Sequence, residues 1–336
     1  MKTIECVPNF SEGRNRAAIG QITRAIAAVN GIRLLNVESG FDVNRTVVTF
    51  TGAPEAVCEA AFRGVEKATE VIDMRTHQGA HPRFGATDVL PLVPLSGITL
   101  EETATLARAL GKRIGEELRL PVFAYAAAAF DERRRSLARC RSGEYEGLAA
   151  KLATPEGRPD FGPAVFVPES GAVAAGARPV LVAFNVNLDT NDVRPAHAIA
   201  GDIRETGRLI RNASGHSIRQ PGLLKAVQAI GWYIEEYGKA QVSMNLCDLA
   251  VTPLHIAFDA ACRQAQARGC RVTGSELVGM APRQALLDAG KYFLEKQQRP
   301  TAVPGEELIA AAVRAMGLEE LTPFLPEKIL MDDVVM

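Results

Sequence analysis

The sequence has little of what marks membrane, secreted or nucleic-acid-binding proteins. Aromatic residues make up only 6% of the 336 positions, with a single tryptophan, although 47% of the residues are hydrophobic. Lys and Arg number 38 against 39 Asp and Glu, so there is no excess positive charge to bind a polyanion or an anionic membrane. No apolar run reaches the ~18 residues of a membrane span, and the N-terminus has no stretch typical of a secretory signal.

The six cysteines are scattered along the chain, and no two of them have C-x-x-C spacing. The sequence therefore gives no support to a zinc site or to a dithiol redox site. In a long chain this pattern is typical of reduced thiols, and we expect a cytoplasmic protein. We expect no metal, no nucleic acid and no membrane as partners. A local basic pocket for a small anion is compatible with the balanced net charge.

Apolar runs of strand length alternate with helical patterns, which predicts an α/β (α+β) layer structure. At one domain per ~150 residues, a chain of 336 residues suggests two domains or subdomains. In the first half we expect strands at 3–7, 32–37, 46–50, 89–95 and 121–126, and helices at 14–29, 54–71 and 100–118. In the second half we expect strands at 180–186, 226–234, 241–246 and 271–278, and helices at 192–210, 254–268 and 282–295.

The densest cluster of polar side chains is the stretch 77–88, directly before an expected strand. It contains His77, His81, Arg83 and Asp88 among glycines that permit close approach of a ligand. This combination favours a proton-transfer site with an anionic partner. Two alternatives stay open. The i, i+4 histidines have the spacing of metal ligands on a helix, although a proline and glycines disfavour a helix there. Either histidine alone is also compatible with a purely structural loop.

Two further polar loops lie next to expected strands. One supplies Glu38, Asn44 and Arg45, and the other supplies Asn9 and Ser11. For Ser11 alone, we expect a structural role as the N-cap of the helix that follows. Loops at the carboxyl ends of strands in an α/β sheet can converge on one ligand, so the three polar loops form one candidate site.

Between the two halves lies a Pro- and Gly-rich tract, 156–177, without periodicity. Its central part, 162–171, matches neither a Walker A motif nor a dinucleotide fingerprint, which disfavours a nucleotide-phosphate loop. Two readings stay open. The tract is a functional loop that lines a slot for a flat ring, with Phe166 as a contact, or it is a plain interdomain linker.

Several separated motifs, in the same order, resemble those of the glutamate formimidoyltransferases. They are VPNFSEG, NRTVVTF, DMRTHQGAHPRFGATDVLPLVPL, RSGEYEGL, PDFGP followed by GARPVLVAFNVNL, QPGLLKAVQAIGWY and AQVSMNL. The resemblance runs from about Ile4 to Pro326, and extends to the transferase portion of the bifunctional formiminotransferase-cyclodeaminases. It implies transfer of the formimino group from N-formimino-L-glutamate to tetrahydrofolate as co-substrate, without a metal. The implied products are 5-formimidoyltetrahydrofolate and L-glutamate, in histidine degradation.

The resemblance also implies site residues and an architecture. The catalytic histidine of the family falls on His81, and an acidic residue near its site falls on Glu38, where the family has an aspartate. The folate-binding stretch falls on Gly162, Pro163, Ala164, Val165, Phe166, Val167, Pro168, Glu169, Ser170 and Gly171, and a second folate contact falls on Gly222, Leu223 and Leu224. Residues 209–219 look like an insertion before that contact. The implied fold has two α/β subdomains, 1–178 and 179–326, each a mixed sheet with outer helices, facing across a folate-binding cleft, followed by a tail, 327–336.

The chemistry of the two substrates suggests a role for each residue. We expect His81 to take the proton from folate N5 and to return it to the departing glutamate nitrogen. A carboxylate such as Glu38 would stabilise the cationic amidine, and the guanidinium forks of Arg45 and Arg83 suit substrate carboxylates. Polar groups of the donor or of the pterin are expected to contact Asn9 and Asn44.

Three rival functions stay open. The first is transfer of a formyl group between 5-formyltetrahydrofolate and glutamate, which the same residues would serve. The second is a folate-binding or scaffolding protein without turnover, and the third is a metal-dependent hydrolase of formiminoglutamate. The family is typically homodimeric, so we expect a homodimer. Because 336 residues suffice only for the transferase, we expect the cyclodeaminase to be a separate protein.

Overall fold

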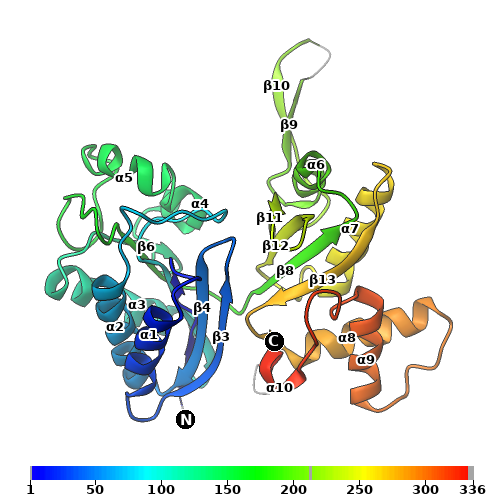
Figure 1. Cartoon of the computed structure of the whole chain (residues 1–336), viewed down its shortest axis with the longest axis horizontal. Helices are drawn as coiled ribbons and strands as arrows, with labels where there is room; N and C mark the ends of the chain where they lie inside the picture. The colour runs from blue at the N-terminus through cyan, green and yellow to red at the C-terminus, as the bar shows by residue number, and fades with distance from the viewer. Residues whose placement is uncertain (1, 212–213, 332–336) are drawn as a thin grey trace. The chain divides into compact units, whose positions relative to one another are not determined.

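The computed structural model describes residues 2–211 and 214–331 of the chain. The chain divides into two compact units between Pro179 and Val180. Each unit combines one large β-sheet with helices, which confirms the expected α/β class (Figure 1). None of the helices in the described part of the chain has the length and apolar character needed to cross a membrane.

The sheet of the first unit has the spatial order β3-β4-(β1, β2)-β5-β7-β6, and β7 runs parallel to both of its neighbours. Its strands are β1 (Thr3–Cys6), β2 (Asn9–Phe10), β3 (Arg33–Gly40), β4 (Arg45–Gly52), β5 (Thr87–Ser96), β6 (Val122–Ala126) and β7 (Val173–Ala177). Both β1 and β2 pair with β4 and with β5. They are two pieces of one strand, interrupted where Pro8 has no N–H for the ladder.

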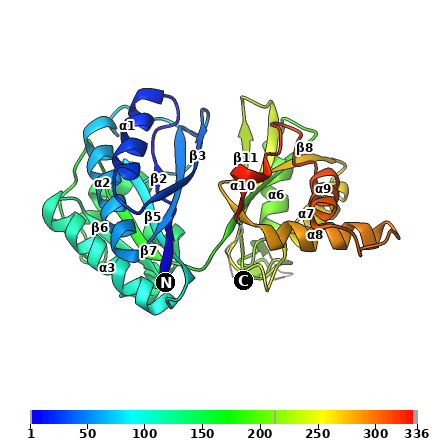
Figure 2. The same ribbon diagram turned by 90° about the horizontal axis from the view of Figure 1, so that it is seen from below.

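Three helices cover one face of this sheet (Figure 2): α1 (Arg16–Ala27), α2 (Pro54–Val71) and α3 (Leu100–Glu117). The expected bounds of α2 are confirmed, and so is the capping box of α3, in which Thr99 and Glu102 bond reciprocally. The expected cap of α1 is wrong. Asn15 caps that helix, whereas Ser11 donates a hydrogen bond to the carbonyl oxygen of Gly85, 2.8 Å away.

The opposite face of the sheet carries a smaller apolar cluster around Phe84, Val89 and Phe123. It is covered at one end by short helices that the sequence pattern did not reveal: a 3₁₀ turn (Glu132–Arg135), α4 (Leu137–Cys140) and α5 (Glu144–Leu152). The rest of this face carries polar side chains from β2, β3 and β4, among them Asn9, Glu38 and Thr49. One face of the sheet is therefore apolar and covered by helices, whereas the other face is partly polar.

Strand β7 shows that the tract 156–177 is not a plain interdomain linker. The last five residues of that tract, VAAGA, form a fully buried strand between β5 and β6, so the tract belongs to the first unit. Small residues are required there, since a Cβ added at Gly176 would lie 2.5 Å from the ring of Tyr125. Such a segment has few of the β-branched residues that usually signal a strand.

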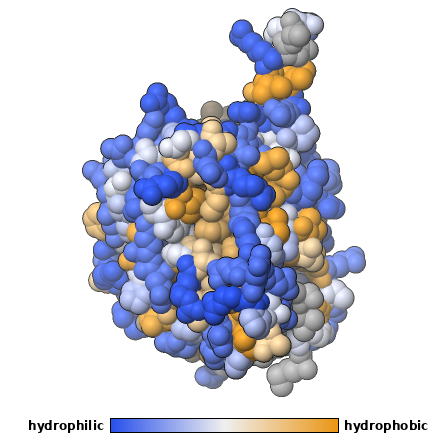
Figure 3. All heavy atoms as spheres, turned by 90° about the vertical axis from the view of Figure 1, so that its right-hand side faces the viewer, coloured by the Kyte–Doolittle hydropathy of each residue, from blue (hydrophilic) through white to orange (hydrophobic). Residues whose placement is uncertain are grey.

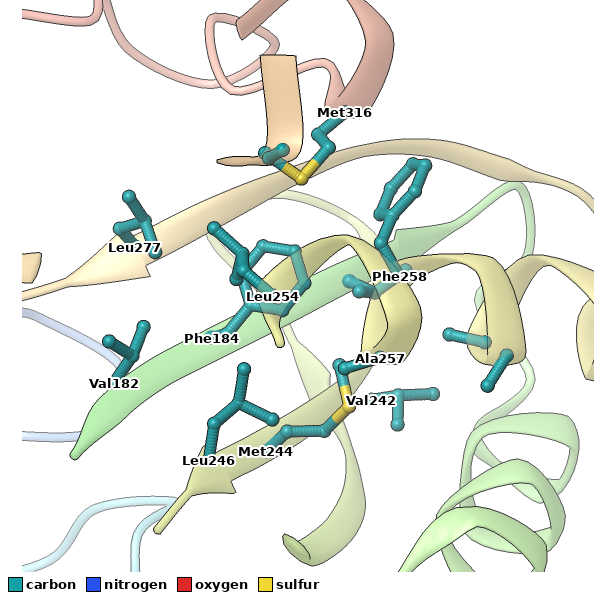
Figure 4. Close-up of a cluster of buried hydrophobic side chains, with 14 of the residues drawn as sticks. Val182, Phe184, Val242, Met244, Leu246, Leu254, Ala257, Phe258, Leu277 and Met316 are labelled. Atoms are coloured by element: carbon teal, nitrogen blue, oxygen red, sulfur yellow. The ribbon is translucent and has the colours of Figure 1, made fainter. Parts of the chain in front are cut away.

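The second unit has an antiparallel sheet in the order β11-β12-β8-β13. Its strands are β8 (Val182–Leu188), β11 (Val227–Ile234), β12 (Lys239–Leu246) and β13 (Val272–Val278). Its longer helices are α6 (Val193–Ile203), α7 (Leu254–Gln266), α8 (Arg283–Lys296) and α9 (Gly305–Met316). Alternate residues of the strands, among them Phe184, Val242 and Met244, pack against Leu254 and Phe258 of α7 in one core (Figure 4).

The expected helix 192–210 ends early, at Ile203, and a hairpin follows it. The hairpin consists of β9 (Arg208–Arg211) and β10 (Ser217–Gln220), which lie at the two ends of the expected insertion, 209–219. Residues 212–213 lie outside the described residues. The hairpin projects from the sheet of its unit, and Figure 3 shows apolar surface on it. Leu209 and Ile218 are 64% and 44% exposed.

The proposed tail, 327–336, begins inside α10 (Pro326–Ile329). It continues as β15 (Leu330–Met331), which pairs in parallel with β14 (Ala281–Pro282) of the second unit. Leu330 belongs to the core of that unit, so this part of the proposed tail packs as an element of the second unit. Residues 332–336 lie outside the described part of the chain.

Candidate active site

Three of the predicted site residues lie on the partly polar face of the first sheet. Glu38 lies opposite Val47 of β4, and Val47 lies opposite Asn9 of β2. Residues that lie directly opposite in neighbouring strands project to the same side of a sheet. Arg45 is two residues before Val47 and therefore projects to that side too. The strand register thus brings Glu38, Asn9 and Arg45 to one face, away from α1–α3.

A buried ion cluster lies next to these residues. The Nη1 atoms of Arg45 and Arg141 are each 2.6 Å from Oδ2 of Asp88. The Asp88 side chain is 0% exposed, and those of Arg45 and Arg141 are 8% and 16% exposed. Arg45 Nε also donates to Asn9 Oδ1, 3.1 Å away. Two guanidinium groups therefore share one carboxylate, which leaves the cluster with one positive charge in excess.

Asp88 is ionised within this cluster. Burial raises the pKa of its carboxyl, but Arg45 and Arg141 outweigh burial and hold the pKa below its ordinary value. Burial lowers the pKa of Arg45, an effect that Asp88 opposes. The second oxygen of Asp88, Oδ1, is buried and has no hydrogen-bond partner among residues 2–211 and 214–331. A buried carboxylate oxygen of this kind normally has a partner, so a water or a ligand N–H group fits there.

His81 is held in one tautomer beside the cluster. Its Nδ1 lies 2.6 Å from the carbonyl oxygen of Pro82. A carbonyl only accepts hydrogen bonds, so Nδ1 carries the hydrogen and Nε2 carries the lone pair. Burial, reinforced by the charges of Arg45 and Arg141, lowers the pKa of the half-buried His81 to about 3. The imidazole is therefore neutral at neutral pH, which is the form that accepts a proton.

Asn44 fixes the loop that carries His81. It adopts φ of 46°, in the left-handed region that asparagine tolerates. Its Oδ1 accepts from Gly13 N, and its Nδ2 donates to Gln78 O, each at 2.9 Å. Its carbonyl oxygen accepts a hydrogen bond of 2.9 Å from Nε2 of His77. The predicted contact residue Asn44 therefore joins three loops and positions the His81 loop.

His77 has a structural environment. Its Nε2 is bonded to Asn44, its Nδ1 accepts from Arg83 Nε at 3.3 Å, and burial lowers its pKa. The stretch 77–81 has no helical structure, so the two histidines are not paired on a helix face. Within the described ranges, no group of three or more His, Cys, Asp or Glu side chains is arranged to hold a metal ion.

The fork of Arg83 binds a carboxylate of its own chain. Its Nη1 and Nη2 lie 2.7 and 2.5 Å from the two oxygens of Glu146, whose side chain is 64% exposed. The Arg83 side chain is 13% exposed. This geometry is the bidentate one that guanidinium groups make with carboxylates. A substrate carboxylate at Arg83 would therefore have to displace Glu146, which is exposed enough to move.

The predicted folate tract, 162–171, lies against the His81 loop. Met74 N donates to Glu169 O at 2.9 Å, and Ala86 N donates to Ser170 O at 2.8 Å. Gly171 has φ of 66°, and a Cβ there would collide with the carbonyl oxygen of Phe84. The glycine is thus required both by its backbone conformation and by the close approach of the two segments.

The middle of this tract is exposed. Val165 is 63% exposed, and the ring of Phe166 packs against Tyr145 with centroids 5.4 Å apart. The other predicted folate contact lies in the second unit. There, Leu223 N and Leu224 N donate to the last carbonyls of α6, and Leu223 is 60% exposed.

Two residues of this site received no role in the sequence analysis. Arg141 is the first residue of the motif RSGEYEGL, and Glu146 is its sixth, so the motif itself was the available signal. Asp88 was included in the polar stretch 77–88, but nothing in the sequence indicated that it would pair with Arg45 and Arg141. These three residues and His81 complete the geometry of the site.

Comparison with known proteins identifies the family of the chain. The family profile described as "Formiminotransferase domain, N-terminal subdomain" matches residues 3–178, and "Formiminotransferase domain" matches residues 183–336. The protein named formimidoyltransferase-cyclodeaminase from Sus scrofa is 47% identical over 332 residues, which are 99% of this chain and 60% of that protein. The chain thus spans about 60% of the length of that relative and of the one from Gallus gallus.

Two shorter relatives match over most of their length. The proteins named glutamate formimidoyltransferase from Streptococcus pyogenes and Thermoplasma acidophilum are 40% and 41% identical. Each alignment covers 88% of this chain, and it covers 94% and 93% of the relatives, respectively. Together with the two family profiles, these matches show that the chain belongs to the formiminotransferase family.

Proposed function

We propose that this chain transfers the formimino group from N-formimino-L-glutamate to tetrahydrofolate, with 5-formimidoyltetrahydrofolate and L-glutamate as products. The observation that carries the proposal is the neutral imidazole of His81 beside two guanidinium groups that share one carboxylate. The excess positive charge suits the carboxylates of a glutamate-based donor, and the neutral imidazole suits proton transfer. The names of two relatives, both glutamate formimidoyltransferase, support the transfer of a formimidoyl group.

In the proposed mechanism, folate N5 attacks the formimino carbon, and Nε2 of His81 accepts the N5 proton. The resulting imidazolium lies near the charges of Arg45 and Arg141, which make it a strong acid. It then donates the proton to the glutamate nitrogen as the bond between that nitrogen and the formimino carbon breaks. One histidine thus serves as base and then as acid, and returns to its starting form.

We assign the remaining predicted residues supporting roles within this proposal. The Glu38 carboxylate would stabilise the cationic amidine, and Asn9 would contact a polar group of the donor. Arg45 would act through the charge of its cluster. Residues 162–171 and 222–224 would contact folate. We further propose formiminotransferase subdomains at 1–178 and 179–326, a cytoplasmic homodimer, and a place for the reaction in histidine degradation.

The pH dependence of kcat/KM tests the role of the lowered His81 pKa. Because the folded enzyme keeps this imidazole unprotonated well below pH 6.5, the acid limb should fall between pH 6.5 and about 3. A bound anionic donor offsets the nearby Arg charges, so the acid limb of kcat should lie at higher pH than that of kcat/KM. Titration of both substrates without protein provides the control. An acid limb of kcat/KM at or above pH 6.5 would contradict the assignment.

Arg83 and Glu146 provide a matched pair of variants. If Arg83 binds the donor, Arg83→Lys loses the fork and should raise the KM for N-formimino-L-glutamate about tenfold, with little change in kcat. Glu146→Gln releases the fork and should leave that KM unchanged or lower it. Steady-state kinetics with varied donor measures both effects. A rise in the donor KM for Glu146→Gln, with none for Arg83→Lys, would assign Arg83 a purely structural role.

The assay that tests the proposed function compares donors. Purified protein is incubated with tetrahydrofolate and either N-formimino-L-glutamate or N-formyl-L-glutamate, with and without a chelator. We expect transfer from the formimino donor, an absolute need for tetrahydrofolate and no effect of the chelator. Preferred transfer of the formyl group would favour the formyl rival. Donor hydrolysis without folate would favour the hydrolase, and folate binding without transfer would favour a scaffold.

A further inference from the structure

The sheet of the second unit has a polar layer on the face opposite α6 and α7. In β8, Phe184 and Val186 face the apolar core, so Asn185 and Asn187 face the other side. Cross-strand pairing places Glu276 of β13 opposite Asn185, and Gln241 of β12 opposite Asn187. Asn187 and Gln241 are 0% exposed, and Asn185 is 5% exposed. Buried amides of this kind are favourable only when their hydrogen bonds are satisfied.

The hydrogen bonds of this layer run in one direction. Trp232 Nε1, which can only donate, bonds Oε1 of Gln241 at 2.9 Å. Gln241 Nε2 then donates to Asn187 Oδ1 at 2.7 Å and to Glu276 Oε1 at 3.0 Å. Asn185 Nδ2 donates to the same Glu276 oxygen at 2.9 Å. One branch of the network therefore ends on Glu276, where both hydrogen bonds go to Oε1.

The polar layer contains a second carboxylate, Glu320, which has an ion-pair partner, whereas Glu276 has none among the described residues. Glu320 accepts from Asn187 Nδ2 at 2.7 Å and also pairs with Nζ of Lys239 at 3.0 Å. Glu276 makes no ion pair with any residue of 2–211 or 214–331. Its Oε2 accepts no hydrogen bond from those residues either. An ionised carboxylate has about four acceptor positions, and the two on Oε2 are left over.

We propose that Oε2 of Glu276 accepts a hydrogen bond from the amino group or the ring N–H of the 2-amino-4-oxopyrimidine ring of a reduced pterin. This inference rests on the proposed function, because it names the residue that recognises the ring of tetrahydrofolate. The ring has a ring N–H and an amino N–H side by side, and either of them can donate to a remaining acceptor position of Oε2. Ile230 lies in the same cross-strand row as Asn185 and Glu276, and is 41% exposed, so it offers the ring an apolar surface.

The amidine of the formimino donor also has neighbouring N–H groups. That donor, however, carries two carboxylates, which need cations close by. The lysine of this layer, Lys239, already pairs with Glu320. The cluster with excess positive charge lies in the first unit, at Arg45 and Arg141. The charges of the polar layer therefore favour the pterin ring over the donor.

Glu276→Gln is a sharp test, because the network determines the orientation of the new amide. The Gln oxygen must take the Oε1 position, where two amides donate, so the new NH₂ group faces the ligand. The new NH₂ group and the N–H of the pterin ring are then both donors, so they cannot form a hydrogen bond with each other. We expect the Kd of 6-methyltetrahydropterin and of tetrahydrofolate to rise at least tenfold, and the Kd of N-formimino-L-glutamate to stay within twofold. Isothermal titration calorimetry on the full chain measures all three.

Two further variants complete the test. Glu320→Gln also removes a hydrogen-bonded carboxylate from this layer and should leave the Kd of both pterins within twofold. Glu276→Asp keeps the charge but shortens the side chain, and should raise these Kd values less than Glu276→Gln does. If the melting temperature shows that Glu276→Gln does not fold, Glu276→Asp is used as the test variant in its place.

The outcomes separate this inference from the proposed function. Unchanged pterin affinity in both Glu276 variants would overturn the inference, even when the wild-type chain transfers the formimino group. A selective loss of N-formimino-L-glutamate binding would overturn it in favour of the donor. Wild-type protein that binds tetrahydropterin through Glu276, but does not transfer the group, would contradict the proposed function alone.

Discussion

Replacing His81 with alanine is expected to lower the kcat of formimino transfer by about 10²- to 10⁴-fold, the range typical for loss of a general acid–base residue. His81 is held as the neutral Nδ1–H tautomer by Pro82 O, so Nε2 is the atom that exchanges the proton. The Kd of tetrahydrofolate should change little, because the variant removes a proton carrier. Single-turnover kinetics and direct binding measurements separate the two effects.

His197→Ala is the matched control, since His197 is exposed on α6 of the second unit. It should leave both kcat and tetrahydrofolate binding unchanged. A His81→Ala variant with wild-type kcat would remove His81 from the mechanism. A variant that loses folate binding and keeps its turnover at saturating folate would make His81 a binding residue.

The largest effect on stability is expected for Asp88→Asn. This variant leaves Arg45 and Arg141 next to each other with no carboxylate between them, and Arg45 is nearly fully buried. Removing one partner from a buried ion pair typically destabilises a protein by about 3–5 kcal/mol. Calorimetric unfolding should therefore show a strongly lowered melting temperature for the transition of the first unit.

Asp73→Asn is the control for Asp88→Asn. Asp73 pairs with Arg75 at the surface, where both side chains are about half exposed. Exposed ion pairs contribute little to stability, so the melting temperature should change little. Equal and small shifts for the two variants would show that Asp88 does not neutralise its two partners in the folded protein.

Much of the fold was predictable, because regular elements carry local signals. Helix α2 begins at Pro54, and α3 begins at the Thr99–Glu102 capping box, and both were located from these residues. The strands with β-branched residues were located within a few residues of their observed ends. Strand β7 was missed because its residues are small, and its place between β5 and β6 comes from tertiary packing.

The site was only partly predictable, because its key contacts are long-range. The sequence singled out His81, Arg45 and Arg83 as charged or titratable residues in loops. It did not show that Arg45 and Arg141 would share Asp88, since these pairings join segments far apart in the chain. Asn44 was expected to contact substrate, but its side chain is used in joining loops. Such assignments depend on the folded arrangement, which one sequence does not display.

The most direct test of formimino transfer is to mix the purified chain with tetrahydrofolate and N-formimino-L-glutamate, and to follow both products by mass spectrometry. We expect 5-formimidoyltetrahydrofolate and L-glutamate to form in equal amounts, at a rate that His81→Ala lowers by at least about 10². L-glutamate released without 5-formimidoyltetrahydrofolate, or equal product formation by His81→Ala and wild-type protein, would contradict a His81-dependent formimino transfer.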